Sequence, residues 1–196
     1  MSHYFINDNS VKSNKRSLYY DYEGIKFRFN SDNGVFSKNE IDEGSNILLN
    51  NYLKKGKVGK VVDVGSGIGF LGIVISKINS CEVDMLEINS RAVGLCEENI
   101  AINGVSKSKV YESNIYEKAN GKYDVVISNP PIRAGKKVVF EILEKAKDYL
   151  NDDGELWVVI RKNQGADSAK KKMIEVFGNC EIIDRSKGFY ILLSKK

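Results

Sequence analysis

The sequence has little histidine, cysteine or proline, and each shortage excludes a kind of chemistry. Among its 196 residues there are one histidine, three cysteines and two prolines. A lone His3 argues against a histidine triad and against a metal site built on several histidines. Cys81, Cys96 and Cys180 stand far apart and form no C-x-x-C pair, so they indicate neither a zinc site nor a redox dithiol. We therefore expect buried free thiols and no bound metal.

Long hydrophobic runs are also missing. No apolar stretch approaches the roughly 18 residues of a membrane span, and the first ten residues, MSHYFINDNS, lack the basic and then apolar pattern of a signal peptide. We expect a cytoplasmic protein without membrane contact. The hydrophobic content of 42% and charged content of 29% are ordinary for one globular domain with at most a small appendage. The net charge of +4 permits an anionic partner without requiring one.

The first third of the chain predicts a small extension before the main domain. We expect disorder over the first dozen residues. Alternating apolar and polar residues around Glu23-Gly24 predict a β-hairpin over 17–22 and 25–29. A helix is expected over 42–53, and Gly56 and Gly59 interrupt the chain after it. The predicted division is therefore residues 1–56, with tail, hairpin and helix, and residues 57–196 as the main domain.

From residue 60 onward, strand patterns alternate with helix patterns. Strands are expected at 61–64, 82–87, 109–112, 123–128 and 155–161, and helices at 68–78, 90–102, 136–150 and 168–177, with a turn at 151–154. Two last strands, 180–184 and 189–193, have a short connection and must be antiparallel. The pattern predicts an α/β fold: a doubly wound, mostly parallel sheet with an antiparallel strand near one edge, plus the N-terminal β-hairpin.

A glycine-rich loop follows the first of these strands, in the stretch VVDVGSGIGFLG at 61–72. Gly65, Gly67 and Gly69 let the backbone turn tightly and approach a ligand, and the amides of the next helix favour a polar or negative group. The loop also matches G-x-G-x-x-G, so a dinucleotide stays possible. Asp63, directly before the glycines, would repel a pyrophosphate but tolerate the ammonium and sulfonium of S-adenosylmethionine.

Polar residues end the next two strands. Glu87 closes the second strand, where a carboxylate can accept hydrogen bonds from a ribose diol. Asn114 follows the third strand and can bond an adenine edge, with Ile88 and Ile115 on either side of the ring. The carboxyl ends of parallel strands share one edge of the sheet. Together with Asp63 and the glycines, these residues predict a nucleoside site.

The fourth strand ends in Asn129-Pro130-Pro131. A residue before proline is held extended, and proline has a fixed φ and no N–H donor. The corner therefore offers acceptors: the Asn129 side-chain carbonyl and the backbone carbonyls beside it. Rigid acceptors suit an exocyclic amino group, whose lone pair would then be turned toward a methyl donor. Methyl transfer depends on alignment more than on an acid or base, so the scarcity of histidine is no objection.

These motifs resemble the class I S-adenosylmethionine-dependent methyltransferases, and within that class the small-subunit ribosomal RNA guanine-N2 methyltransferases and their small single-domain relatives. The stretches that carry the resemblance are Gly34-Val35-Phe36-Ser37, Asp42-x-Gly44, Asp63-Val64-Gly65-Ser66-Gly67-x-Gly69, Glu87-Ile88-Asn89, Asn99-x-x-x-Asn103-Gly104, Asn114-Ile115-Tyr116 and Asn129-Pro130-Pro131-Ile132-Arg133-x-Gly135-Lys136. The resemblance implies a Rossmann-like fold.

The resemblance also implies roles for particular residues. S-adenosylmethionine would be the cofactor, and Asn129 and Pro130 would be the catalytic residues that hold the acceptor nitrogen. Substrate contacts would come from Phe36, Ile132, Arg133 and Lys136. The residues expected to contact the cofactor are Asp63, Gly65, Ser66, Gly67, Glu87, Ile88, Asn114, Ile115 and Asn129.

This sequence departs from the family pattern in three ways. Ile132 stands where many Asn-Pro-Pro enzymes carry an aromatic residue that stacks on the base, so Phe36, Tyr116 or Phe140 could supply that surface. Asn114 stands where the class often has aspartate, and either side chain can accept from the adenine amino group. The larger rRNA enzymes carry an extra N-terminal domain, whereas only a hairpin precedes the core here.

Basic residues follow the ends of two strands and predict the partner. Arg133, Lys136 and Lys137 follow the Asn-Pro-Pro corner, and Arg161 and Lys162 end the next strand, which suits a phosphate backbone. We therefore expect an N-methyltransferase that acts on a base amino group in RNA, with guanine N2 of 16S ribosomal RNA favoured and ribosomal RNA or the small subunit as partner. The alternatives are methylation of a protein glutamine or a DNA adenine, an inactive RNA-binding module, and a dinucleotide oxidoreductase.

Overall fold

The protein is described by a computed structural model over residues 11–196. His3 and most of the segment expected to be disordered lie outside the described residues. The strands are β1 (Arg16–Tyr22), β2 (Ile25–Ser31), β3 (Val61–Val64), β4 (Val83–Glu87), β5 (Ser108–Glu112), β6 (Tyr123–Ser128), β7 (Leu150–Arg161), β8 (Glu181–Ser186) and β9 (Phe189–Lys195). The helices are α1 (Glu43–Lys55), α2 (Phe70–Asn79), α3 (Ser90–Asn103), α4 (Lys136–Tyr149) and α5 (Ala166–Phe177).

Seven strands form the main sheet, in the order β5-β4-β3-β6-β7-β9-β8. β3, β4, β5, β6 and β7 pair in parallel, while β9 is antiparallel to both β7 and β8. The prediction of a doubly wound, mostly parallel sheet with an antiparallel strand near one edge is confirmed. The strand order reverses between β3 and β6, which is where such sheets bind ligands.

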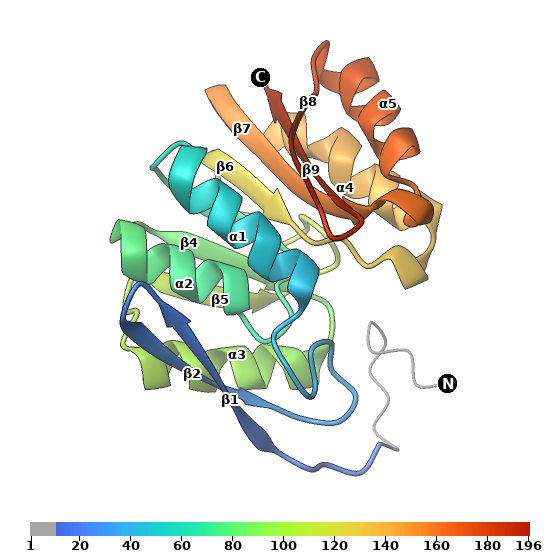
Figure 1. Ribbon diagram of the computed structural model, residues 1–196. Helices are drawn as coiled ribbons and strands as arrows, with labels where there is room; N and C mark the ends of the chain where they lie inside the picture. The colour runs from blue at the N-terminus through green and yellow to red at the C-terminus, as the bar shows by residue number, and fades with distance from the viewer. Residues whose placement is uncertain (1–10) are drawn as a thin grey trace.

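Helices cover both faces of this sheet (Figure 1). One apolar cluster joins α1, α2 and α3 to one face, with Leu48, Ile73 and Leu95 among its members. A second cluster joins α4 and α5 to the other face, through residues such as Ile142 and Met173. Because β3 and β6 are buried between these layers, most of their side chains are apolar on both faces, with Asp63 and Ser128 as buried polar exceptions.

The N-terminal hairpin forms a separate two-stranded sheet, as predicted, and it packs on the same side as α3 (Figure 1). Phe27 and Phe29 of β2 are buried in the first apolar cluster. Asn99 of α3 accepts from the Asn30 backbone N–H at 2.6 Å and donates to the Asn30 carbonyl at 3.0 Å. The hairpin is thereby tied to α3 by both packing and hydrogen bonds.

α1 packs directly on the main sheet. Its Tyr52 ring meets the Trp157 ring of β7 edge to face, with 5.8 Å between ring centroids. Leu48 and Leu49 of the same helix are fully buried. The predicted division between residues 1–56 and 57–196 stays a prediction.

The prediction that a turn at 151–154 separates the helix from the next strand was wrong, because β7 already begins at Leu150. Leu150 pairs with Tyr123, and the register then shifts before Glu155 pairs with Val125. The turn-forming residues therefore form an irregularity within the strand pairing, with Asp153 at a φ of 60°. Two short 3-10 turns, Ile132–Ala134 and Lys162–Gln164, were not predicted.

The three cysteines are free, as expected, but only Cys96 is fully buried; Cys81 and Cys180 are half-buried. Within residues 11–196, no helix has the length and apolar character needed to cross a membrane. That same part of the chain contains no group of three or more potential metal-binding side chains. The cytoplasmic location stays a prediction.

Candidate functional site

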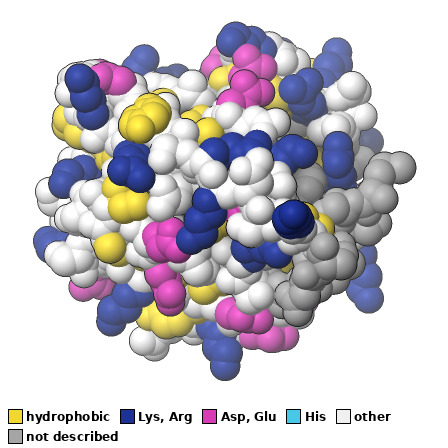
Figure 2. All heavy atoms as spheres, turned by 90° about the horizontal axis from the view of Figure 1, so that it is seen from below, with side chains coloured by type: hydrophobic (Ala, Val, Ile, Leu, Met, Phe, Trp, Pro, Cys, Tyr) yellow, Lys and Arg dark blue, Asp and Glu magenta, His cyan; other side chains and the backbone are white. Residues whose placement is uncertain are grey.

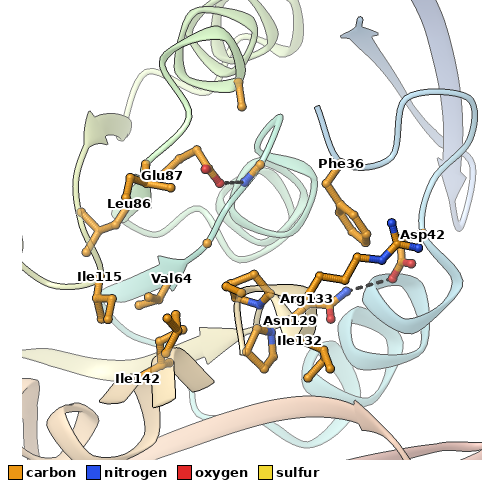
Figure 3. Close-up of a pocket in the computed structure, with 18 of the residues that line it drawn as sticks. Phe36, Asp42, Val64, Leu86, Glu87, Ile115, Asn129, Ile132, Arg133 and Ile142 are labelled. Atoms are coloured by element: carbon orange, nitrogen blue, oxygen red, sulfur yellow. Dashed lines mark hydrogen bonds between the residues drawn. The ribbon is translucent and has the colours of Figure 1, made fainter. Parts of the chain in front are cut away.

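A cavity of about 470 Å³ lies at the carboxyl ends of β3, β4 and β6, where the strand order reverses (Figure 3). This volume is in the range of small-molecule sites. Its lining includes Phe36, Asp42, Gly65, Gly67, Glu87, Ile88, Asn114, Ile115, Asn129, Pro130, Ile132, Arg133 and Arg161. A second cavity of about 30 Å³ shares Phe36, Gly65, Gly67 and Asn129 with it and is also lined by Ser45, Asp63 and Ser66.

The glycine loop between β3 and α2 has the conformation predicted from its sequence. Gly65, Gly67 and Gly69 all have positive φ, at 76°, 56° and 88°. A Cβ on Gly67 would meet nothing within 4 Å, so this glycine keeps the loop open toward a ligand. A Cβ on Gly69 would lie 2.5 Å from Cys96 Sγ, so that glycine is required by packing. The loop is held to β4 because the Gly65 N–H donates to the Leu86 carbonyl at 2.8 Å.

Asp63 is a buried carboxylate at the end of β3. Its Oδ2 accepts from the Gly72 N–H at 3.2 Å, while Oδ1 has no hydrogen-bond partner among the described residues. Burial raises the pKa of Asp63 from 3.8 to about 7, the Gly72 hydrogen bond opposes the rise, and the nearby charge of Glu87 adds to it. A ligand that brings positive charge and N–H donors here would satisfy this group.

Ser66 is the second polar side chain beside the smaller cavity. Its Oγ is buried and, within the part of the chain that the structure describes, also lacks a hydrogen-bond partner. Buried polar atoms are normally paired. Two such atoms, Asp63 Oδ1 and Ser66 Oγ, belong to residues lining the same small cavity, so this position is suited to a polar group of a ligand.

Glu87 joins the glycine loop to the loop after β4. Its Oε2 accepts from the Gly67 N–H at 2.7 Å, and its Oε1 accepts from the Asn89 N–H at 2.9 Å. Burial raises the pKa of Glu87, and the backbone N–H groups of Asn89, Gly67 and Ile88 oppose the rise. Each carboxylate oxygen can accept more than one bond, so Glu87 can also accept from hydroxyl groups in the cavity.

The predicted adenine-binding residues lie at the same cavity. Asn114, Ile88 and Ile115 all line it, and Ile88 is 43% exposed. Asn114 Nδ2 donates to Glu117 Oε1 at 3.1 Å, and the amide oxygen of Asn114 can accept from a ligand. An oxygen acceptor at this place suits an amino group on a purine.

The Asn-Pro-Pro corner borders both cavities through Asn129. Asn129 Nδ2 donates to Asp42 Oδ2 at 2.9 Å and to Ser45 Oγ at 2.8 Å. Pro130 is buried and lines the larger cavity. The structure therefore brings the acceptor corner together with the glycine loop and Glu87 at one cavity, as predicted.

The four predicted substrate residues divide into two groups. Phe36, Ile132 and Arg133 line the cavity (Figure 3). Lys136 is not among the described residues that line it; its Nζ lies 4.9 Å from the centroid of the Phe140 ring. A role for Lys136 toward RNA stays a prediction.

One of the three alternative stacking rings lies at the cavity. Phe36 lines it and is 37% exposed. Tyr116 is buried and stacks on Tyr149, with ring centroids 4.6 Å apart. Phe140 lies beneath the ammonium groups of Lys136 and Lys172. Of these three rings, Phe36 is the one that lines the cavity.

Sequence reasoning assigned no role to Asp42 and Ser45, and it missed Phe189 and Gln164, which line the cavity. Asp42 stands in a recognised motif and has the residue type of a helix N-cap. Nothing in its sequence environment connects it to Asn129, because the two residues are 87 positions apart. Arg161, expected at the rim, lies over the Phe189 ring at 4.3 Å from its centroid.

Comparison with solved structures identifies the fold. The chain superposes with a TM-score of 0.84 on the T. thermophilus 16S rRNA N2 G1207 methyltransferase (RsmC) in complex with AdoMet and guanosine. The match covers 93% of this chain and 50% of that one, at 21% sequence identity. At this identity the likeness shows the fold alone, which is the fold of a methyltransferase domain.

Comparison of sequences identifies the family. The methyltransferase small domain family matches residues 26–193, and the chain belongs to this family. It is 40% identical over 197 residues to the Bacillus subtilis (strain 168) protein called "Uncharacterized protein YbxB", covering 99% of this chain and 98% of that protein. It is 32% identical over 189 residues to ribosomal RNA small subunit methyltransferase C of Vibrio cholerae serotype O1, covering 92% of this chain but 53% of that protein.

Proposed function

We propose that this protein is an S-adenosylmethionine-dependent N-methyltransferase that acts on the exocyclic amino group of a base in RNA, with guanine N2 of 16S ribosomal RNA as its substrate. One observation carries the proposal. The acceptor corner at Asn129 and Pro130 and the cofactor-type residues Glu87 and Gly67 line one cavity of about 470 Å³. The family membership and the likeness to rRNA small subunit methyltransferase C support the same activity.

The residues present fit the proposed cofactor. Asp63 Oδ1 and Ser66 Oγ are buried acceptors that the described residues leave unpaired, and they suit the ammonium of a methionine moiety. Glu87 can accept from the ribose hydroxyls, and Asn114 can accept from the adenine amino group. When bound, S-adenosylmethionine supplies an activated methyl group.

The Asn129 corner would hold the substrate nitrogen. The Asn129 side-chain oxygen and the Pro130 carbonyl can accept the two N–H bonds of an exocyclic amine, and they leave its lone pair directed at the methyl carbon. The bound cofactor would supply the methyl group to this nitrogen and keep its sulfur as a neutral thioether, and the methylated nitrogen would release one proton to water. Alignment of this kind can supply roughly 7–11 kcal/mol of a barrier, so no histidine base is needed.

The surroundings of the corner suit an RNA strand. Phe36 offers an aromatic surface for a base, and Arg133 and Arg161 line the same cavity with positive charge. Figure 2 shows many Lys and Arg side chains on one face of the molecule, with fewer Asp and Glu side chains among them. A paired base would have to leave its helix to enter the cavity, at a cost of a few kcal/mol.

The test is transfer of labelled methyl groups from S-adenosylmethionine to RNA and to small ribosomal particles that lack their own modifications, followed by digestion to nucleosides. We expect label in N2-methylguanosine. Label in N6-methyladenosine would keep the mechanism and overturn the base. Label only in protein glutamine would overturn the RNA substrate. RNA binding without cofactor binding in calorimetry would favour an inactive RNA-binding module.

A further inference from the structure

The side-chain amide of Asn129 is held in one orientation by two residues of the first turn of α1 and its cap. Asn129 Nδ2 donates to Asp42 Oδ2 at 2.9 Å (Figure 3). It also donates to Ser45 Oγ at 2.8 Å, so both of its N–H bonds are used. An ionised carboxylate can only accept. Turning the amide by 180° would place the Asn129 oxygen against the Asp42 oxygen, so the nitrogen must face Asp42 and the oxygen must face away from it.

We propose that Asp42 and Ser45 are positioning residues for the transfer reaction: they fix the Asn129 amide so that its oxygen, and not its nitrogen, is presented to the substrate amino group. This inference rests on the proposed function. If the amide were flipped, the N–H groups of Asn129 would face the N–H groups of the substrate. The oxygen that accepts from the substrate amine would then point away from it. The selectivity of the corner for an amine would then depend on two residues that lie outside the Asn-Pro-Pro motif.

The start of α1 is built to hold these two side chains in place. Asp42 is the N-cap of α1, and the same Oδ2 atom accepts from the Ser45 N–H at 2.8 Å. The carboxylate is therefore anchored by the helix end before it meets Asn129. Ser45 is 7% exposed, so water competes little for its hydroxyl.

Gly44 explains why this helix end can lie so close to the site. A Cβ at Gly44 would lie 2.7 Å from Phe189 Cε1 and 3.1 Å from Asp42 Oδ2. A side chain there would push α1 away from β9 and carry Asp42 with it. The Asp-x-Gly-Ser stretch thus has three separate tasks: Asp42 caps and orients, Gly44 permits the close approach, and Ser45 completes the pair of acceptors for Asn129.

Two variants separate positioning from helix capping. Ser45→Ala removes one acceptor and leaves the cap oxygen of Asp42 in place, and alanine is a good helix former. Asp42→Ser keeps a residue that caps well but removes the carboxylate that receives Asn129. We expect kcat to fall roughly tenfold in the first, as for one lost hydrogen bond, and about 100-fold in the second, as for a misplaced reacting group.

Controls and a conservative variant sharpen the test. Ser76→Ala removes a comparably buried helical hydroxyl, which donates to the Cys81 carbonyl at 2.9 Å in α2, and should leave kcat unchanged. Asp42→Asn can still place an oxygen toward both donors, so it should recover most of the activity that Asp42→Ser loses. Ser45 also lines the smaller cavity, so the affinity for S-adenosylmethionine in calorimetry can fall in Ser45→Ala, but it should fall by a smaller factor than kcat.

A second measurement does not depend on turnover. In the wild-type protein, the side-chain ¹⁵N–¹H pair of Asn129 should exchange slowly with solvent in NMR spectra, because both protons are hydrogen-bonded. That protection should fall in Ser45→Ala and Asp42→Ser and persist in Ser76→Ala. Slow exchange in the wild type that is lost in Ser45→Ala and Asp42→Ser supports the inference, even if the wild-type protein methylates no RNA. A lack of RNA methylation would overturn the proposed function alone. Fast exchange in the wild type, or wild-type kcat in both variants, would overturn the inference.

Discussion

Replacing Asp63 with asparagine tests whether the buried Asp63 carboxyl group is protonated in the folded protein. Asp63 is 1% exposed, and its pKa is raised from 3.8 to about 7, chiefly by burial. Between about pH 4 and pH 7 the folded protein therefore binds a proton at Asp63 that the unfolded chain has lost. Stability decreases with rising pH through this window, and the loss is complete above the folded-state pKa.

The magnitude follows from the size of the pKa change. One pKa unit corresponds to about 1.4 kcal/mol, so ionising Asp63 above pH 7 costs the free protein about 4 kcal/mol of folding free energy. Asparagine does not titrate, and its oxygen can still accept from the Gly72 N–H. Asp63→Asn should therefore match the wild type near pH 4 and be more stable near pH 8, with a thermal midpoint higher by roughly 8–16 °C.

The assay is thermal and urea unfolding of both proteins at a series of pH values without ligand. The informative quantity is the stability difference as a function of pH, because other titrating groups largely cancel in it. Asp84→Asn is the matched control. Asp84 is also a buried strand aspartate, but it accepts from the Tyr123 hydroxyl at 2.7 Å and lies 3.7 Å from Lys60 Nζ, so its replacement should destabilise the protein at pH 8.

Cofactor binding gives the same prediction a second readout. An ammonium group beside Asp63 would favour its ionised form, so binding of S-adenosylmethionine should strengthen in the wild type as the pH rises toward about 7. In Asp63→Asn the affinity should be lower and nearly constant over that range. A stability difference that does not change between pH 5 and pH 8 would refute the reasoning, since Asp63 would then be charged in the free protein throughout.

Further variants test other parts of the site. Asn129→Ala should lower methyl transfer by about 100-fold or more while leaving S-adenosylmethionine affinity within a few-fold, and loss of both would contradict the assigned role. Glu87→Gln should weaken cofactor binding roughly 10–100-fold in calorimetry, because both carboxylate oxygens accept backbone N–H groups and an amide can satisfy only one. Gly44→Ala should lower the free energy of unfolding by about 1–3 kcal/mol, measured in urea, because its Cβ would lie 2.7 Å from Phe189 Cε1. Arg133→Gln should reduce the slope of log affinity for RNA against log salt by about one; an unchanged slope would remove Arg133 from the phosphate contacts.

Much of the fold could be predicted from local patterns. The runs Val61–Val64 and Tyr123–Ser128 are mostly apolar on both faces because helices cover both sides of the sheet, and short runs of this kind are typical of buried parallel strands. The boundary at Leu150 could not be predicted in this way. Asn151 to Gly154 have the composition of a turn, and only the pairing of Leu150 with Tyr123 extends β7 through them.

Most residues of the candidate site could also be predicted from the sequence. Polar residues and glycines that directly follow buried strands are seldom needed for packing, so they indicate a binding site. The chain order alone placed Asp63, Glu87 and Asn129 at one edge of a parallel sheet. It did not show that Tyr116 is buried against Tyr149, or that Phe36 is the ring at the cavity, since both depend on how loops pack.

The sequence by itself determined the order of strands and helices, the glycine loop and the acceptor chemistry of the Asn-Pro-Pro corner, since each depends on residues within a few positions of one another. Only the tertiary structure decided that the side-chain nitrogen of Asn129 is bonded to Asp42 and Ser45. Asp42 and Asn129 meet because α1 packs across the sheet and its first turn approaches Phe189 at Gly44. Contacts over such a separation are set by packing of whole elements, and no local pattern of residues encodes them.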